Sequence, residues 1–515
     1  MMITKLLLKH KIEILVSVLL VIFYFATRLP NLLSFPIFTD EAIYVRWTQI
    51  GLNDANWRFI SLTDGKQPSF VWLGMVFLKL FQEPLLSLRL VSVVSGLFVM
   101  GGLFFLTYEL FKNKWTALLS SFLYVVFPFA VVYDRLALYD SLLAVFVVWA
   151  TYFAVLLARK IRLDIAFFLG FAIGGAMLTK SSGVFSAYLL PVTLFLFDFK
   201  NKKWKENLIK WGFLALFAFI LAEGFYNVIK LSPFAHIIGE KNTIFVYTFS
   251  EWLSNPFVNT LGNFKGLSDW LFTYLTPFFV FFILVSFATI KKFPKEKLLL
   301  LFYFVLPFAA LTLFGKVIFP RFIFFMSISL IPLVSVGLTE VILWSHNFLK
   351  KRGIDSIWGV STLIIIFFIL YPLKVSLDFV FNPKNVAIAS ADREQYISGW
   401  PSGGGIKESI EFFKKEAEDK KIFIATEGTF GLMPYALDIY LGDNKNITTK
   451  GYWPIEEFPE ELLEQGDMSP VYFVFYQPCP GCEFPGDAPD SWPLKLISKY
   501  KKGENTFYSI YSLEQ

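Results

Sequence analysis

Long apolar stretches with few charges recur along the first three quarters of the chain. The clearest lie at residues 12–25, 90–106, 142–157 and 213–222. A bilayer core about 30 Å thick needs about twenty apolar helical residues, and runs of this kind are long enough or nearly so, which predicts membrane-spanning helices and not the interior of a soluble protein. Short loops rich in lysine and arginine separate them.

The basic loops orient the predicted spans. They lie at residues 5–11, 112–114, 159–162, 200–205, 291–297 and 350–352, and the positive-inside rule places all of them in the cytoplasm. About eleven spans then fit, at residues 11–27, 85–111, 115–133, 140–158, 164–178, 184–198, 208–229, 270–290, 298–314, 321–343 and 356–374. An odd number of crossings leaves the N-terminus cytoplasmic and the C-terminal region extracytoplasmic, as in a multi-pass protein of the plasma membrane.

Three apolar segments are short for simple crossings. Residues 69–80 are about a dozen, and counting them as a span would invert every later loop, so we expect a helix lying in the outer interface. Residues 164–178 and 184–198 form either two short crossings or a re-entrant hairpin. The first outer loop, residues 28–84, is long, and loops of that length usually have a functional reason.

The composition changes after residue 373. Residues 392–515 are dense in Lys, Glu, Asp and Gly. Residues 406–417 have helical spacing, residues 421–425 and 471–476 have strand character, and residues 428–431 are expected to turn the first strand into a helix. The predicted organisation is an all-α polytopic membrane domain over residues 1–375 and a small α/β extracytoplasmic domain over residues 376–515.

Composition narrows the functional class. The chain is 56% hydrophobic and 17% charged, with a mean hydropathy of +0.57 and a net charge of +6. The positive charge is spread over loops instead of one face, which argues against nucleic-acid binding. The only cysteines, Cys479 and Cys482, have CxxC spacing; a local disulfide is favoured over a zinc site or a redox role.

Acids at the outer ends of the predicted spans are the candidate catalytic groups. A charged side chain close to the membrane core costs free energy, so its presence there suggests a function. Asp40 and Glu41 are adjacent in the first outer loop. Asp40 is a candidate general base; alternatively, Thr39 or Asp40 caps a helix that starts at Glu41. Asp140 begins a span, where the helix dipole alone would also favour an acid.

Cations recur at the same outer ends. They are Lys66, Arg89, Arg135, Lys180 and Arg321. Each alone is explained by snorkelling to lipid headgroups. Together they suit a sugar linked through phosphate to a lipid, because that leaving group needs cations and no strong acid. These residues do not demand a cofactor, although Asp40 and Asp140 are the ligands expected if a divalent Mg²⁺ or Mn²⁺ is used.

These residues resemble the GT-C glycosyltransferase superfamily, in its dolichyl-phosphate-mannose–protein mannosyltransferase and aminoarabinose transferase branch. The resemblance covers residues 10–345 and rests on six pieces in order: Asp40-Glu41 with Tyr44, Lys66-Gln67-Pro68 with Trp72, Arg89-Leu90, Arg135 with Ala137 and Asp140, Leu178-Thr179-Lys180, and Pro320-Arg321-Phe322. It implies inverting transfer from a polyprenyl-phosphate sugar. It also implies Asp40 as base, Lys66 near the donor phosphate and Asp140 as the acid of the second outer loop.

The chain departs from the family pattern at three positions. Gln67 stands where the family usually has proline, Ser181 where it usually has glycine, and Gly65 where an acid often precedes the lysine. These departures affect which donor is expected more than which class of reaction is expected.

The acceptor, whether lipid, glycan or protein, is not revealed by the sequence, and neither is the sugar. A transporter or lipid flippase is the alternative class, and a catalytically inactive membrane scaffold is a third. The transporter is less favoured, because few acids fall inside the predicted spans.

Overall fold

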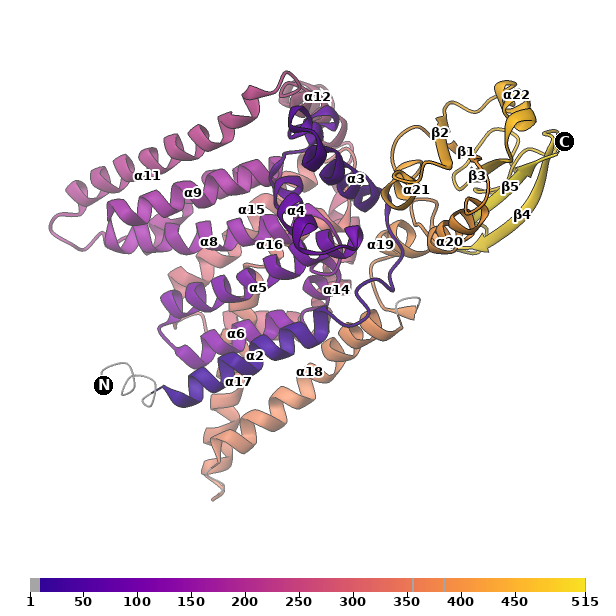
Figure 1. Ribbon diagram of the computed structural model, residues 1–515. Helices are drawn as coiled ribbons and strands as arrows, with labels where there is room; N and C mark the ends of the chain where they lie inside the picture. The colour runs from indigo at the N-terminus through magenta and orange to yellow at the C-terminus, as the bar shows by residue number, and fades with distance from the viewer. Residues whose placement is uncertain (1–9, 354–355, 383–384, 515) are drawn as a thin grey trace. The chain divides into compact units, whose positions relative to one another are not determined.

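The computed structural model describes residues 10–353, 356–382 and 385–514 (Figure 1). The chain divides into two compact units, which are described separately. The membrane unit comprises Met1–Pro30, Phe59–Phe70 and Arg89–Ala387, and the α/β unit comprises Asn31–Arg58, Val71–Leu88 and Ile388–Gln515. Two segments that the sequence grouped with the first domain, residues 31–58 and 71–88, thus pack in the α/β unit. Lys5 and Lys9 of the predicted basic N-terminal segment lie outside the described residues.

Helices dominate the membrane unit. They are α2 (Lys11–Arg28), α5 (Pro84–Phe111), α6 (Lys114–Val126), α7 (Pro128–Tyr133), α8 (Tyr139–Lys160), α9 (Leu163–Thr179), α10 (Phe185–Tyr188), α11 (Trp204–Tyr226), α12 (Ile237–Phe245), α13 (Phe249–Ser254), α14 (Thr260–Ala288), α15 (Pro294–Phe314), α16 (Phe324–Ser327), α17 (Leu330–Lys350) and α18 (Ile357–Phe381). Short 3-10 turns connect several of them, at Ile60–Asp64, Ser181–Val184, Leu190–Leu196, Asn227–Leu231 and Pro320–Ile323.

Six helices among the described residues are long and apolar enough to cross a membrane. They are α5, α8, α11 with its 3-10 extension, α14, α15 and α18, and the bent pair of residues 320–327 and α17 gives a seventh if it is one span. The chain is therefore an integral membrane protein. The total of about eleven crossings stays a prediction.

The segment after α9 is wound more tightly than an α-helix. Residues 181–196 are mostly 3-10 helix around the single turn α10. A 3-10 helix rises about 2.0 Å per residue, so this short segment reaches about 30 Å. Whether this segment and α9 make two crossings or a re-entrant hairpin stays a prediction.

Small residues let α9 and α11 pack closely, and the two helices run side by side in Figure 1. A Cβ on Gly170 would lie 2.8 Å from the Ala218 carbonyl oxygen, and one on Gly174 would lie 3.2 Å from the Ala222 Cα. This spacing of small residues is how membrane helices approach without a hydrophobic driving force between them.

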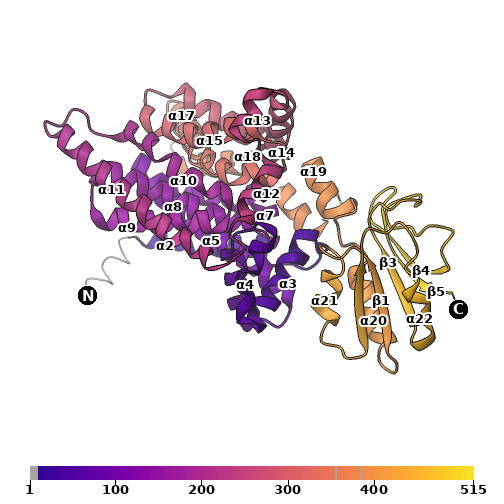
Figure 2. The same ribbon diagram turned by 90° about the horizontal axis from the view of Figure 1, so that it is seen from above.

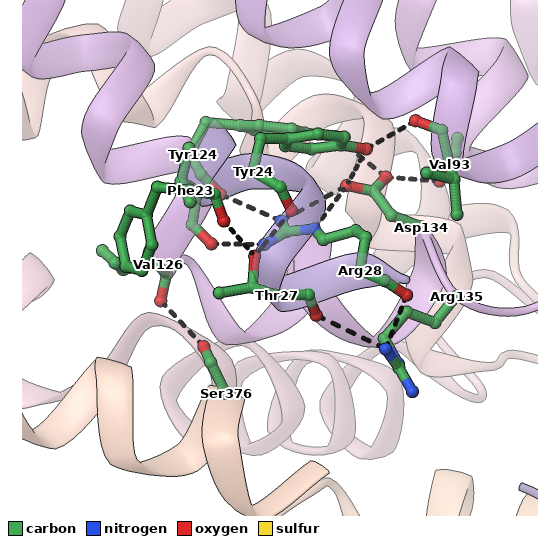
Figure 3. Close-up of polar contacts among 12 residues, drawn as sticks. Phe23, Tyr24, Thr27, Arg28, Val93, Tyr124, Val126, Asp134, Arg135 and Ser376 are labelled. Carbon is green, nitrogen blue, oxygen red and sulfur yellow. Dashed lines mark hydrogen bonds and ion pairs between the residues drawn. The ribbon is translucent and has the colours of Figure 1, made fainter. Parts of the chain in front are cut away.

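A fully buried ion pair joins the first helices of the membrane unit (Figure 3). Asp134 follows α7, and its carboxylate lies 3.3 Å from the Arg28 guanidinium at the end of α2. The same carboxylate accepts hydrogen bonds from Tyr24 at 3.2 Å, Tyr124 at 3.0 Å and Ser141 at 2.8 Å. Asp134 thus links α2, α6 and the start of α8, which carries Asp140.

The α/β unit is built on a five-stranded mixed sheet. Its strands are β1 (Ile422–Glu427), β2 (Ile447–Tyr452), β3 (Val471–Phe475), β4 (Leu494–Lys501) and β5 (Phe507–Leu513), in the order β2-β1-β3-β5-β4. β1 is parallel to β2 and β3, and β5 is antiparallel to β3 and β4. The β1 and β3 strands and the 428–431 turn were predicted, and the helix predicted at 406–417 is also present.

The helices of this unit are α3 (Thr39–Asn53), α4 (Ser69–Leu80), α19 (Ser390–Arg393), α20 (Ile406–Glu416), α21 (Tyr435–Leu441) and α22 (Glu461–Met468). α20 and α22 cover opposite faces of the sheet (Figure 2). Phe413 of α20 packs against Tyr472 on one face, while Leu462 of α22 joins Phe473 in the core of the other. α3 packs along α21. Residues 69–80 are helical as predicted; their place at the membrane interface stays a prediction.

Removing the Asp134 carboxylate should destabilise the membrane unit. Asp134→Ala leaves the Arg28 charge buried without its counter-ion, and breaking a buried pair costs about 3–5 kcal/mol. We expect a marked loss of monodisperse protein and a lower Tm, measured in detergent by size exclusion and thermal unfolding. Asp198→Ala, at an exposed carboxylate, is the control. An unchanged Tm in Asp134→Ala would show that the ion pair does not hold these helices together.

Candidate functional site

Three cations and one carboxylate meet in the membrane unit. Lys180 directly follows α9, and its Nζ lies 2.7 Å from Oδ1 of Asp140 in the first turn of α8. Lys66 follows the turn at Ile60–Asp64, and Arg321 lies in the turn at Pro320–Ile323. Both lie close enough to Lys180 for their charges to act on it. Four distant segments thus converge on this cation cluster.

Aromatic rings wall the cation cluster. The Nζ atoms of Lys66 and Lys180 lie 5.7 Å and 4.8 Å from the ring centroids of Phe245 and Phe322, and these two rings are 6.2 Å apart. The Arg321 guanidinium lies 5.0 Å from another ring, that of Phe319. Cations are attracted to such ring faces.

The charge of the cluster suits an anion. Three cations and one carboxylate sum to a net charge of +2. Asp140 and Arg321 are largely buried, with 3% and 9% of their surface exposed. Because concentrated charge of one sign is costly in a poorly solvated place, an anion bound there would be stabilised.

The residues around Lys66 attach it to the segment that holds Lys180. Gln67 Nε2 donates to Ser181 Oγ at 2.9 Å, and Ser69 Oγ donates to Thr179 Oγ1 at 2.9 Å. Gln67 and Ser181 are two of the departures from the family pattern, and they bond to each other. The departures are therefore coupled, and they fix Lys66 beside Lys180.

Gly65, the third departure, has a conformational reason. Its φ is +65°, and a Cβ there would lie 2.9 Å from the Ile237 carbonyl oxygen of α12. The preceding Asp64 forms an ion pair with Lys241 of the same helix. An acid directly before Lys66 would not fit, because only glycine adopts this conformation without strain at so close an approach.

Arg135 lies with Arg28 and Arg89 in a second group of cations. Arg135 Nη1 donates to the Arg28 carbonyl at 2.6 Å, and its guanidinium lies 5.8 Å from the Phe379 ring centroid. Arg89 is fully buried in α5 and acts electrostatically on Arg135. The structure thus places these two predicted phosphate ligands with Arg28, a residue that the sequence did not single out.

Asp40 and Glu41 stand in the first turn of α3, in the α/β unit. The Glu41 side chain is fully buried, and its Oε2 accepts the Phe38 backbone N–H at 3.1 Å, which caps the helix. The helix begins at Thr39, so the capping role predicted for Thr39 or Asp40 was wrong: Thr39 Oγ1 instead donates to the Pro401 carbonyl at 2.9 Å. Asp40 is half-buried beside them.

A buried carboxyl that the sequence did not indicate lies at the end of β1. Oε2 of Glu427 accepts the backbone N–H groups of Tyr476 and Gln477, both at 2.9 Å. Lys502, just after β4, donates from Nζ to the carbonyl oxygens of Trp400 and Ser402 at 3.0 Å and 3.1 Å. Burial raises the pKa of Glu427 to about 7 and lowers the pKa of Lys502 to about 7. The sequence feature that could have indicated this site is an acid, Glu427, at the end of an apolar strand and directly before a glycine, Gly428.

The described residues form a disulfide but no metal site. In the part of the chain that the structure describes, no three His, Cys, Asp or Glu side chains gather as a metal site. Metal binding by Asp40 and Asp140 stays a prediction. Cys479 and Cys482 are joined by a disulfide, which confirms the favoured pairing.

The family model of dolichyl-phosphate-mannose-protein mannosyltransferases matches residues 65–224. That stretch contains Lys66, Asp140 and Lys180. No curated protein sequence matches the chain. The match supports the resemblance that the motifs indicated.

Solved structures share the fold over nearly the whole chain. ArnT from Cupriavidus metallidurans matches over 98% of both chains, with a TM-score of 0.59 at 13% identity in the apo state and 0.58 at 12% identity when bound to undecaprenyl phosphate. AglB from Archaeoglobus fulgidus, an archaeal oligosaccharyltransferase in complex with an inhibitory peptide and a dolichol-phosphate, gives 0.50 at 12% identity over 84% of this chain and 64% of its own. The predicted fold class, a GT-C-type membrane domain with a small α/β domain, is confirmed.

The raised pKa of Glu427 predicts a pH dependence of stability. The folded form binds the proton more tightly than an unfolded glutamate, whose pKa is near 4.5, so this residue's contribution is complete below pH 4.5 and is lost as the pH rises to about 7. The loss is at most about 3 kcal/mol. Glu427→Gln keeps an acceptor and should flatten the difference in Tm between pH 5 and pH 7.5. Glu418→Gln, at an exposed carboxyl, is the control; equal pH profiles for wild type and Glu427→Gln would contradict the assignment.

Proposed function

We propose that this chain is an inverting glycosyltransferase that moves a sugar from a polyprenyl-phosphate donor to an acceptor hydroxyl at the outer face of the membrane. The single observation that supports it most is the cation cluster of Lys66, Lys180 and Arg321 around Asp140. Two solved proteins of this fold carry undecaprenyl phosphate and dolichol-phosphate in their structures. In this proposal the N-terminus is cytoplasmic and the α/β unit extracytoplasmic.

The cation cluster would act on the leaving group. As the bond between the anomeric carbon and the phosphate oxygen breaks, its electron pair passes to the lipid phosphate. Lys66, Lys180 and Arg321 would stabilise that charge, and preorganised electrostatic stabilisation of this kind accounts for much of the rate enhancement in many enzymes. Asp140 would hold Lys180 in place through their ion pair. Arg89 and Arg135, which lie with Arg28, would add further positive charge for the phosphate.

Asp40 would be the general base. The acceptor oxygen attacks the anomeric carbon on the face opposite the phosphate, which inverts the configuration, and its proton passes to the Asp40 carboxylate. Glu41 would act by fixing the first turn of α3 through its bond to the Phe38 N–H. No step of this scheme requires a metal, and it applies alike to hexosyl and pentosyl donors.

Asp40→Asn should lower kcat by about two to three orders of magnitude, the usual contribution of a general base, and leave the Tm unchanged. The measurement is transfer from a radiolabelled polyprenyl-phosphate sugar by purified protein in nanodiscs. Asp54→Asn, the same change at an exposed residue at the other end of α3, is the matched control. Unchanged turnover in Asp40→Asn would remove it from the mechanism, and flipping of the lipid without sugar transfer would favour the transporter alternative.

Lys66→Ala should weaken donor use. Losing one charge-assisted contact to phosphate costs about 1.5–3 kcal/mol, which corresponds to about a ten- to hundredfold fall in kcat/KM for the donor. Lys66→Arg should retain most activity. Lys265→Ala, at an exposed lysine of α14, should behave as wild type; a similar fall in both alanine variants would indicate a general effect of surface charge.

A further inference from the structure

Aromatic side chains stand exposed along one edge of the α/β unit. Trp400, Phe430 and Trp453 are 40%, 45% and 56% exposed. Phe430 follows β1 and Trp453 follows β2, while the Trp400 ring lies 6.3 Å from that of Tyr476, which follows β3. The three rings therefore lie at the carboxyl ends of the three parallel strands. Adjacent strands are about 4.8 Å apart, so the row is about 10 Å long.

This edge is where a sheet of this kind binds ligands. In open α/β sheets the ligand crevice lies outside the carboxyl ends of the parallel strands. The Phe430 ring is also held in place, because it packs at 6.2 Å from the buried Trp47 of α3 and at 5.5 Å from Tyr435. Rigid aromatic side chains lose little entropy when they bind.

Polar groups lie beneath the row. Oε1 of Glu427 and Oγ of Ser402 are buried and have no hydrogen-bond partner among the described residues. Glu427 itself is fully buried, and the next residue, Gly428, has no side chain to cover it. Buried polar atoms without partners are rare in native proteins and call for an explanation, such as a polar ligand.

The N-terminus of α3 touches this edge. A Cβ on Gly431 would lie 3.4 Å from Thr39 Cγ2, and the Thr39 backbone N–H donates to the Pro401 carbonyl at 3.1 Å. Gly431 is next to Phe430, and Pro401 is next to Trp400. The residue after Thr39 is Asp40, so the helix turn that carries the proposed base adjoins this edge.

We propose that this aromatic edge binds the acceptor, and that the acceptor is a carbohydrate. Pyranose rings present flat C–H faces that pack on exposed aromatic faces such as those of Trp400 and Phe430, and hydroxyls that bond to the few polar groups of such a site. A peptide would instead pair with the side of an edge strand, β2 or β4, and not with strand ends. The inference rests on the proposed function only in assigning the bound sugar the role of acceptor.

Binding of simple sugars, without donor, tests the site. Methyl glycosides of mannose, glucose and galactose and their disaccharides would be titrated into the full chain in nanodiscs and followed by saturation-transfer NMR. We expect at least one to bind saturably, and Trp400→Ala and Phe430→Ala to weaken it at least tenfold. Leu463→Ala on α22, equally exposed at 47%, should bind as wild type. Circular dichroism checks that each variant is folded.

Three results would overturn the proposal: no glycoside binds wild type, all variants bind alike, or only hydroxyl-bearing peptides bind at this edge. Quenching of the Trp400 contribution to fluorescence by brominated lipid would likewise overturn it, because the rings would then be a membrane anchor. Failure of the proposed function is seen separately, as sugar transfer that is absent or indifferent to Asp40→Asn while glycosides still bind.

Discussion

The buried pairing of Arg28 with Asp134 is the interaction on which the rest of the membrane unit depends. One carboxylate receives donors from α2, α6 and α8, and so fixes where α8 begins. Asp140 is in that first turn, and it holds Lys180. The Asp134 carboxylate, which helps the helices to pack, thus also sets the position of Lys180 in the cation cluster, through Asp140.

The departures from the family pattern illustrate how a motif can change without losing its geometry. Gln67 and Ser181 lie far apart in the sequence, yet each supplies the partner of the other. Gly65 permits a close contact with α12 while Asp64 pairs with Lys241 of that helix. Compared position by position, each difference looks like the loss of a family residue. The contacts of Gln67 with Ser181 and of Gly65 with α12 show instead how the segment around Lys66 is held in place.

Periodicity and charge placement were enough to predict most helices of the membrane unit, because a long apolar run has few other options in a bilayer. The sequence missed β2, β4 and β5, because these strands are only partly buried and polar residues interrupt their apolar pattern, whereas β1 and β3 are buried throughout. It also missed the pairing of Arg28 with Asp134, which are 106 residues apart. Pairings between distant residues depend on tertiary packing, and no local pattern encodes them.

The two outermost strands of the sheet carry a further consequence. β4 exposes Lys495, Lys499 and Lys501, and β2 places Lys450 beside Glu461 of α22. Charged edges resist pairing with the backbone of another molecule. Where many copies of this protein crowd together in the plane of a membrane, the charged side chains on these two outer strands therefore disfavour strand-to-strand aggregation.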